Sequence, residues 1–379
     1  MPTRRDFLAS AATVLATGVA AQMLGQHGSQ AQAAPSPQPT TQPTSDNQKK
    51  LGWAIVGIGK LTDGQILPAL AICKQSRLTA FVSGHPAKVP PILKKYNLDP
   101  NSVHVYNYDN YDTIANDPSI DIVYIVLPNG MHAEYTDRAL KAGKHVLCEK
   151  PMANSTDECR QMIETARITG KKLMIAYRVH HELYNQKAIE LCQNGKLGKP
   201  RLIITDHTFH LGDVNAWRLN KKLAGGGALV DVGIYGINAT RYLSREEPIS
   251  VTAQITETPM DPRFVEVEES TAWTLKFPSG LLANCTASYN AKGTNRCRII
   301  LEDGMIDMEP ATAYMGNTLR DPKPIDLPHV NQFQVMMDYF SDCVANNKTP
   351  DTPGEEGLQD MRIIEAIYEA GRTGRVVLL

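Results

Sequence analysis

The chain has 379 residues, of which 42% are hydrophobic and 21% charged, and its formal net charge is −1. This ordinary globular composition and length predict two domains with ample surface to bury. Because no long basic run is present, the sequence predicts no nucleic-acid partner and no membrane partner. The seven cysteines are scattered without metal-ligand spacing, which indicates small buried apolar side chains and no metal site.

Residues 1–34 resemble an export signal. Arg4 and Arg5 stand just before an Ala-rich apolar stretch at 9–24, and small residues at 31–33 suit cleavage. Paired arginines in this position resemble a twin-arginine signal, which predicts a periplasmic protein exported in its folded state. The competing interpretation is a basic N-terminus on a disordered tail.

The rest of the chain divides into three segments. Residues 35–50 are rich in Pro, Thr and Gln, which predicts an extended arm or linker. Residues 51–175 alternate strand and helix patterns, which predicts an α/β domain with a doubly wound parallel sheet of the Rossmann type. Residues 176–379 carry short alternating strands and few helices, which predicts a second α/β domain with a mostly antiparallel sheet.

The apolar patterns place the elements in chain order. Strands of the first domain are predicted at 53–56, 77–84, 121–128, 144–150 and 172–177, with helices at 65–73, 86–96, 132–142 and 155–169. Strands of the second domain are predicted at 200–209, 249–257, 270–277, 281–289 and 296–302, with helices at 233–243, 330–345 and 355–371.

A glycine turn follows the first predicted strand. Gly57 permits a tight turn, Gly59 lets the backbone approach a pyrophosphate, and the next helix offers its positive N-terminal end. Thr62 takes the third position of the fingerprint, so the motif is incomplete and a plain strand-turn is the alternative. The candidate cofactor-binding residues in this loop are Gly57, Gly59, Lys60 and Leu61.

The end of the second predicted strand favours NADP over NAD. An NAD site usually has Asp or Glu there, accepting from the ribose 2′-hydroxyl. Here Ser83 ends the strand and Lys88 follows shortly after. A hydroxyl and a cation suit a 2′-phosphate, which a carboxylate would repel. The alternative is an ordinary solvated lysine.

Polar residues also gather at the ends of two further predicted strands, where ligands of such sheets bind. Leu-Pro-Asn lies at the end of the strand at 121–128, and Glu-Lys-Pro lies at the end of the strand at 144–150. A lysine and a glutamate there are placed for catalysis, although a lone lysine is most often a solvated charge. The candidate cofactor-binding residues of this group are Leu127, Pro128, Asn129, His132, Glu149 and Lys150.

Asp231 and Tyr235 are the acid–base candidates of the second domain. They follow three glycines and are four residues apart, so they share a face if this segment is helical. A neighbouring ammonium lowers the pKa of a phenol, which is ordinarily about 10. Lys150 beside Tyr235 would therefore form an acid–base pair, with Asp231 orienting it. The alternative is that Asp231 caps a helix and Tyr235 is a core aromatic.

Arg178 ends the last strand of the first domain and could bind a sugar hydroxyl or a phosphate. Two histidines follow closely, at 180 and 181, but adjacent side chains point in different directions and do not form a metal pair. His207 and His210 are likewise unpaired, so these histidines predict no metal.

Taken together, the motifs that contain these residues resemble those of one known family. The motifs are GIG at 57–59, LPN at 127–129, CEKPM at 148–152, YRVH at 177–180, WRL at 217–219 and AGGGALVDVGIYGINATRYL at 224–243. The chain is similar to the glucose-fructose oxidoreductase / inositol dehydrogenase (Gfo/Idh/MocA) family over about residues 52–310. It resembles most the glucose-fructose oxidoreductase subgroup, because Tyr235 stands where most members carry His.

The resemblance implies a Rossmann domain followed by a large open sheet that packs against another subunit, in a dimer or tetramer. It implies tightly held NADP(H), with the N-terminal arm helping to cover the adenine. It implies catalytic roles for Lys150, Asp231 and Tyr235, with Arg178 beside them at the sugar site. The further positions that it implies are Ser83 and Lys88 at the 2′-phosphate, with Arg178, Trp217 and Arg218 also near the cofactor.

The activity that this resemblance implies is hydride transfer from an aldose to a second sugar in a ping-pong cycle. An NADP-dependent aldose dehydrogenase with exchangeable cofactor is the first alternative. A non-catalytic sugar-binding protein on the same fold is the second, although it would have no need of the acid–base set. In that subgroup the loop before Trp217 borders the sugar site. The corresponding loop at 207–216 looks shorter here, so the resemblance does not identify the acceptor sugar.

Overall fold

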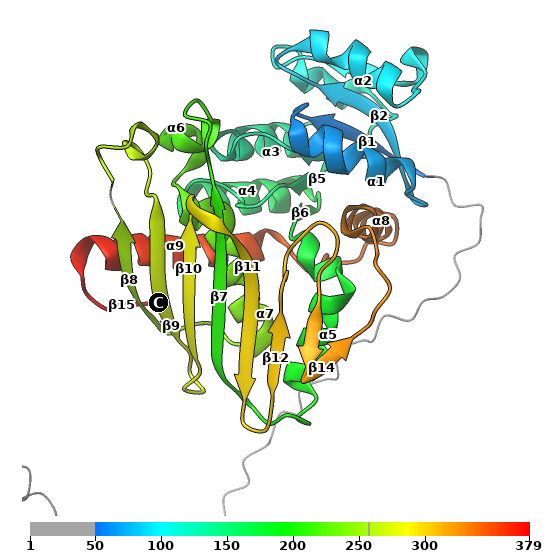
Figure 1. Cartoon of the computed structure of the whole chain (residues 1–379). Coiled ribbons are helices and arrows are strands. Elements are labelled where there is room, and N and C mark those ends of the chain that lie inside the picture. Colours follow the sequence, from blue (N-terminus) through cyan, green and yellow to red (C-terminus); the bar gives the residue numbers. More distant parts are fainter. Residues whose placement is uncertain (1–49, 257) are drawn as a thin grey trace, which may run out of the picture. The chain divides into compact units, whose positions relative to one another are not determined.

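Two sheets hold the named strands of the computed structural model, which describes residues 50–256 and 258–379. The predicted signal at 1–34 and residues 35–49 of the predicted arm lie outside the described residues. The first sheet has six parallel strands and the second has nine, mostly antiparallel, so the predicted α/β fold class is confirmed (Figure 1).

The first sheet has the strand order β3-β2-β1-β4-β5-β6. Its strands are β1 (Leu51–Val56), β2 (Ser76–Val82), β3 (His104–Tyr106), β4 (Ile122–Ile125), β5 (His145–Cys148) and β6 (Leu173–Ile175). Its helices are α1 (Leu67–Ala71), α2 (Val89–Lys95), α3 (His132–Lys141) and α4 (Thr156–Thr169). The central strands are apolar and buried on both faces, as parallel sheets require. The order reverses between β1 and β4, and sheets of this kind bind ligands beyond the carboxyl ends of the strands at such a reversal.

The second sheet has the order β14-β13-β12-β11-β7-β10-β9-β8-β15, and its one parallel pair is β7 with β10. Its strands are β7 (Pro200–His210), β8 (Ser250–Thr256), β9 (Ser270–Lys276), β10 (Leu282–Ser288), β11 (Asn290–Leu301), β12 (Met305–Met308), β13 (Leu319–Asp321), β14 (Lys323–Ile325) and β15 (Val377–Leu378). Buried and exposed residues alternate along β8, β9 and β10, so one face is apolar and the other polar. Helices α7 (Ile234–Ser244) and α9 (Gly354–Thr373) pack against this sheet (Figure 1).

Some elements were not among those expected from the sequence. They are β3, α5 (Leu183–Gln193), the four-residue α6 (Lys221–Ala224) and β12 to β15. The apolar repeat of α5 is weak, and the short strands give little pattern to read. All seven cysteines are free and buried, which confirms their predicted role as small apolar side chains. Within the described residues, no helix is long and apolar enough to cross a membrane.

Helix α8 (Gln332–Ala345) returns from the second sheet to the first. Its apolar face enters the core beneath β1, where Trp53 donates a hydrogen bond to Ser341 Oγ at 3.0 Å. Its Asp338 accepts from the backbone N–H groups of Lys74 and Gln75, both at 2.8 Å. The segment that follows the second sheet therefore fixes the entry to β2.

Candidate active site

Lys150 lies directly after β5 and makes contact with the segment that leads into α7. Its Nζ donates to the Asp231 carbonyl at 2.6 Å, lies 3.5 Å from Asp231 Oδ1, and stands 4.6 Å from the ring centre of Tyr235. Burial would lower the pKa of Lys150, but attraction to Tyr235 and Asp231 outweighs burial and raises it. The ammonium is thus fixed against the phenol, as the sequence predicts.

Asp231 lies in one π-helical turn, Leu229–Gly233, that precedes α7. Its Oδ2 accepts from Arg218 Nε at 2.8 Å and from Tyr289 Oη at 2.9 Å, and no side-chain cap hydrogen bond is formed. Burial would raise the pKa of Asp231, but Lys150 and Arg218 outweigh it and lower the pKa to about 2. Asp231 therefore stays ionised and anchors Lys150, and the cap interpretation does not apply.

Arg178 holds the phenol oxygen of Tyr235. It begins the short helical turn η6 (Arg178–His181) after β6, and its Nη2 donates to Tyr235 Oη at 3.0 Å. The same guanidinium donates to the Thr312 carbonyl at 2.7 Å and to Gln332 Oε1 at 2.6 Å. Within the described residues, Arg178 is therefore the side chain that donates to the Tyr235 oxygen, whereas Asp231 orients the pair through Lys150.

His207 and Tyr314 lie beside this cluster, and the sequence analysis assigned neither to the site. His207 is buried, its ring stacks on Tyr235 with 5.9 Å between centroids, and its two nitrogens have no partner among the described residues. Burial lowers the pKa of His207 to about 4, so the ring is neutral at pH 7. Tyr314 is half-exposed, and its ring lies 4.5 Å from the Arg178 guanidinium.

The sequence contains only weak signals that His207 and Tyr314 belong to the site. His207 is an inward-facing position on the alternating strand β7, where a buried polar side chain is unusual. Tyr314 lies in an irregular loop. Gln332 donates to the carbonyls of Ala313 and Tyr314, at 2.7 and 2.9 Å, and Arg178 donates to the Ala313 carbonyl at 3.4 Å, so the loop is held at the site.

The glycine loop has the shape that a pyrophosphate requires. Gly57 has φ +100°, and a Cβ there would lie 2.2 Å from the Val126 carbonyl oxygen. A Cβ on Gly59 would meet no atom within 4 Å, so the backbone is open to a ligand. Thr62, at the incomplete third position, donates to the Gly57 carbonyl at 2.7 Å and closes the loop from inside. Lys60 is exposed and Leu61 half-buried at the start of the helical segment.

Ser83 and Lys88 lie near this loop. Ser83 is buried at the carboxyl end of β2, and its Oγ accepts from His85 N at 3.1 Å, which leaves its own proton free to donate. Lys88 Nζ reaches to 3.5 Å from the Ile58 carbonyl, which places an exposed cation beside the glycine turn. The donor set therefore fits a dinucleotide with a 2′-phosphate.

Several other candidate residues hold the loops at the carboxyl end of the first sheet. Asn129 donates to the Ala224 carbonyl at 2.8 Å, next to Leu127 and Pro128 at the end of β4. His132 is fully buried between the carbonyls of Leu127 and Pro151, at 2.9 and 2.8 Å, so its ring ties two loops together. It therefore has no free ring nitrogen to offer a cofactor, contrary to the expectation from its place at a helix start.

Three candidate residues are engaged with protein groups. Glu149 is buried and accepts from Tyr124 Oη at 2.6 Å, and burial raises its pKa. Arg218 is bound to Asp231, and its guanidinium lies 4.7 Å from the ring of Trp217. In the described part of the chain, no group of three or more His, Cys, Asp or Glu is placed to hold a metal ion.

The fold and site place the chain in a family. Residues 51–177 match the oxidoreductase family with an NAD-binding Rossmann fold, and residues 185–307 match the GFO/IDH/MocA C-terminal domain. These matches cover more than half of the chain. The chain therefore belongs to the Gfo/Idh/MocA family of oxidoreductases, which confirms the predicted resemblance and the prediction of an enzyme.

Relatives of established name fall in the same family. The chain is 31% identical over 354 residues to D-xylose 1-dehydrogenase [NADP(+)] of Haloarcula marismortui, covering 89% of this chain and 95% of the relative. It is 30% identical over 336 residues to D-xylose 1-dehydrogenase (NADP(+)) 2 of Haloferax volcanii, covering 86% and 99%. Among solved structures, aldose-aldose oxidoreductase from Caulobacter crescentus, complexed with glycerol, matches with 43% identity and a TM-score of 0.83, covering 87% and 100%.

Proposed function

We propose that this protein is an NADP-dependent oxidoreductase of aldoses that moves a hydride from one sugar to a second. The observation that carries the proposal is the pair of cations on one phenol: Lys150 Nζ at 4.6 Å from the ring of Tyr235 and Arg178 Nη2 at 3.0 Å from its oxygen. The aldose-aldose oxidoreductase at 43% identity supports the substrate class, and the two NADP(+)-dependent relatives support the cofactor.

Tyr235 is the acid and base of the proposed reaction. It accepts the proton of the hydroxyl at the sugar carbon being oxidised and returns a proton to the carbonyl being reduced. Arg178 donates to the phenol oxygen throughout, so it stabilises negative charge there. Ionised Asp231 keeps Lys150 in place for the same purpose. When bound, the nicotinamide supplies the hydride acceptor and donor.

The first test is an absorbance titration of gel-filtered protein without added nucleotide. Glucose is added first, and xylose, fructose or another aldose second. We expect reduced nicotinamide to appear with the first sugar and to disappear with the second, which also identifies the acceptor. No change in the presence of added NADP+ and any of these sugars would contradict the proposal.

A dehydrogenase with exchangeable cofactor is the second candidate, and the names of the two D-xylose dehydrogenases favour it. It predicts no absorbance change until NADP+ is supplied, and then one reduced nucleotide for each sugar oxidised. The ratio of product to nucleotide separates the two candidates, because a resident cofactor turns over many sugars per nucleotide.

The location and assembly are further parts of the proposal. The paired arginines at 4 and 5 support export to the periplasm, and replacing both with lysine should retain the protein in the cytoplasm. The polar face of the second sheet supports a homo-oligomer through that face. Light scattering of the purified protein gives its mass in solution, and a monomer would contradict this part.

A further inference from the structure

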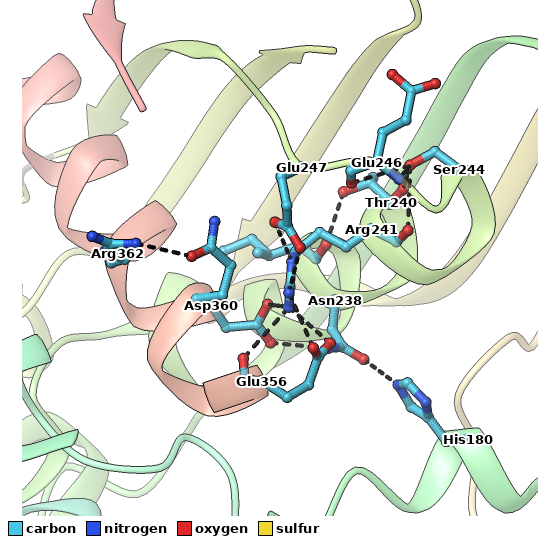
Figure 2. A network of polar contacts seen from close by, with 12 residues as sticks. His180, Asn238, Thr240, Arg241, Ser244, Glu246, Glu247, Glu356, Asp360 and Arg362 are labelled. Carbon is cyan, nitrogen blue, oxygen red and sulfur yellow. Dashed lines mark hydrogen bonds and ion pairs between the residues drawn. The ribbon is translucent and has the colours of Figure 1, made fainter. Parts of the chain in front are cut away.

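A second buried arginine, Arg241, lies in a cluster of carboxylates between α7 and α9 (Figure 2). Arg241 is 5% exposed, and its guanidinium binds three carboxylates. The distances are 2.7 Å to Glu247, 2.9 Å to Glu356 and 2.6 Å to Asp360. Two of these carboxylates, Glu356 and Asp360, come from α9, so the cluster joins α9 to the helix that carries Tyr235.

Asp360 also begins a chain of hydrogen bonds that leads to the site. Its Oδ2 accepts from Asn238 Nδ2 at 3.0 Å, and Asn238 Oδ1 pairs with His180 Nε2 at 2.7 Å. His180 belongs to the short turn that Arg178 begins, and Asn238 lies three residues after Tyr235 on α7. The chain therefore links the two elements that present Arg178 and Tyr235 to each other.

The ionisation of Asp360 determines which group donates and which accepts in the two hydrogen bonds of Asn238. An ionised carboxylate only accepts, so Asn238 must turn its amide N–H toward Asp360 and its oxygen toward His180. His180 must then carry its proton on Nε2. A neutral acid or amide at position 360 can itself donate, which lets the Asn238 amide turn over and removes the acceptor of His180.

We propose that Asp360 is a positioning residue that, through Asn238 and His180, holds Arg178 in register with Tyr235, and that uptake of a proton by Asp360 releases this hold. The inference rests on the proposed function, because Arg178 and Tyr235 are the groups whose register it sets. Asp360 touches no reacting group and acts only through the two residues between.

The surroundings of Asp360 support a proton uptake near neutrality. Burial raises its pKa to about 6, with the neighbouring Glu356 adding to the rise and Arg241 opposing it. The phenol of Tyr177 also faces Asp360, and Glu247 shares the Arg241 guanidinium. The pKa of His180 is lowered by burial, so its ring stays neutral while Asp360 titrates.

The test compares Asp360→Asn with Glu247→Gln in the full-length enzyme. Both variants remove one carboxylate from Arg241, but within the described residues the Glu247 carboxylate forms no hydrogen bond with Asn238 or His180. We expect Asp360→Asn to lower kcat about tenfold at pH 7.5 with little change in sugar KM, as a small misplacement of catalytic groups does. Glu247→Gln should retain the wild-type kcat.

The pH profile gives a readout that a merely structural role would not move. Wild-type kcat should fall as pH drops through about 6, where Asp360 takes up its proton. Asp360→Asn should lack this acid limb and stay low throughout. If the limb persists in Asp360→Asn, another group such as Glu149 causes it and the proposal is overturned.

A rescue variant and a spectroscopic signal complete the test. Asn238→Asp combined with Asp360→Asn moves the carboxylate one residue toward His180, restores its acceptor, and should recover most of the lost kcat. The ¹⁵N shifts of His180 should report the Nε2–H form in wild type and the other tautomer in Asp360→Asn. Unchanged shifts together with unchanged kcat would overturn the proposal. A wild-type protein inactive on every sugar would instead overturn the proposed function, and the His180 signal would still decide the present inference.

Discussion

The two buried arginines of this molecule are held in opposite ways. Arg178 is 6% exposed and donates to a hydroxyl, two carbonyls and an amide, and no ion pair joins it to a carboxylate within the described residues. Arg241 is 5% exposed and is surrounded by three carboxylates. The charge of Arg178 is thus left for a group that becomes negative during reaction, whereas the charge of Arg241 is more than compensated.

This difference distinguishes an arginine that faces the candidate acid–base group from one that joins two helices. Beside Arg178 stand buried polar atoms without partners, such as the ring nitrogens of His207. Within the described residues, the side-chain nitrogens of Arg241 have acceptors at every position. Native proteins leave few buried polar atoms unpaired, so the His207 nitrogens, beside the candidate acid–base group Tyr235, are candidates for a ligand contact. The Tyr177 hydroxyl near Asp360 also has no partner among the described residues.

The largest effect on turnover is expected from removing the phenol hydroxyl of Tyr235, beside Arg178. Tyr235→Phe should lower turnover about 10²–10⁴-fold, because the acid–base group is lost. Stability should change little, since Arg178 keeps its bonds to Thr312 and Gln332. Turnover is measured with the sugar pair that the titration identifies, and bound nucleotide by its absorbance after denaturation. Near-normal turnover would contradict the assigned role.

Removal of the cation from the Arg241 cluster should lower stability. Arg241→Leu leaves Glu356 and Asp360 without their cation and should cost about 3–5 kcal/mol of unfolding free energy. Lower pH should restore part of the loss, because these carboxyls can then take up protons. Arg167→Leu, which removes an exposed pair with Glu164, is the control and should leave the free energy of unfolding nearly unchanged. Urea unfolding measures both, and equal losses would contradict the comparison.

The pH dependence of stability isolates Asp360 within that cluster. Its pKa is raised from an ordinary 3.8 to about 6, so its contribution to stability is full below pH 3.8 and is lost as pH rises through 6. Asp360→Asn has no such dependence, so its stability relative to wild type should improve by about 2–3 kcal/mol between pH 4 and pH 8. A constant difference across this range would show that Asp360 keeps an ordinary pKa.

Local features of this site were readable in the sequence, and long-range ones were not. The glycine turn, the Glu-Lys-Pro strand end and the Asp231–Tyr235 segment are short patterns, and the structure brings Lys150, Asp231 and Tyr235 together. The partners that orient them come from far along the chain. Arg178 and Gln332 are 154 residues apart, and Tyr289 is 58 residues from Asp231. Such pairs depend on how α8 and β10 pack, which no local pattern records.

His132 also shows the limit of local sequence patterns, because its position was predicted but its hydrogen-bonding partners were not. Its place at the start of a helix near the crevice predicted a cofactor contact, but the direction of its ring is set by the carbonyls of Leu127 and Pro151. The short loops around these carbonyls decide where the ring points. The sequence could place the residue correctly and still leave its role open.

The smallest effect should come from replacing His207. It tests directly whether the unpaired atoms beside Arg178 bind a ligand. His207 is buried, with two ring nitrogens that no described residue satisfies. If a sugar hydroxyl is the missing partner, His207→Phe should raise sugar KM about two- to tenfold, the value of one neutral hydrogen bond. Stability should stay equal or increase by about 1 kcal/mol, because an unpaired polar ring is replaced by an apolar one.

His210→Phe provides the matched control, since His210 is an exposed histidine at the end of the same strand. It should leave sugar KM unchanged. A stability loss in His207→Phe with normal KM would mean that the ring has a partner inside the protein, such as a buried water. In that case His207 would need no ligand, and its ring nitrogens would no longer indicate a sugar contact beside Arg178.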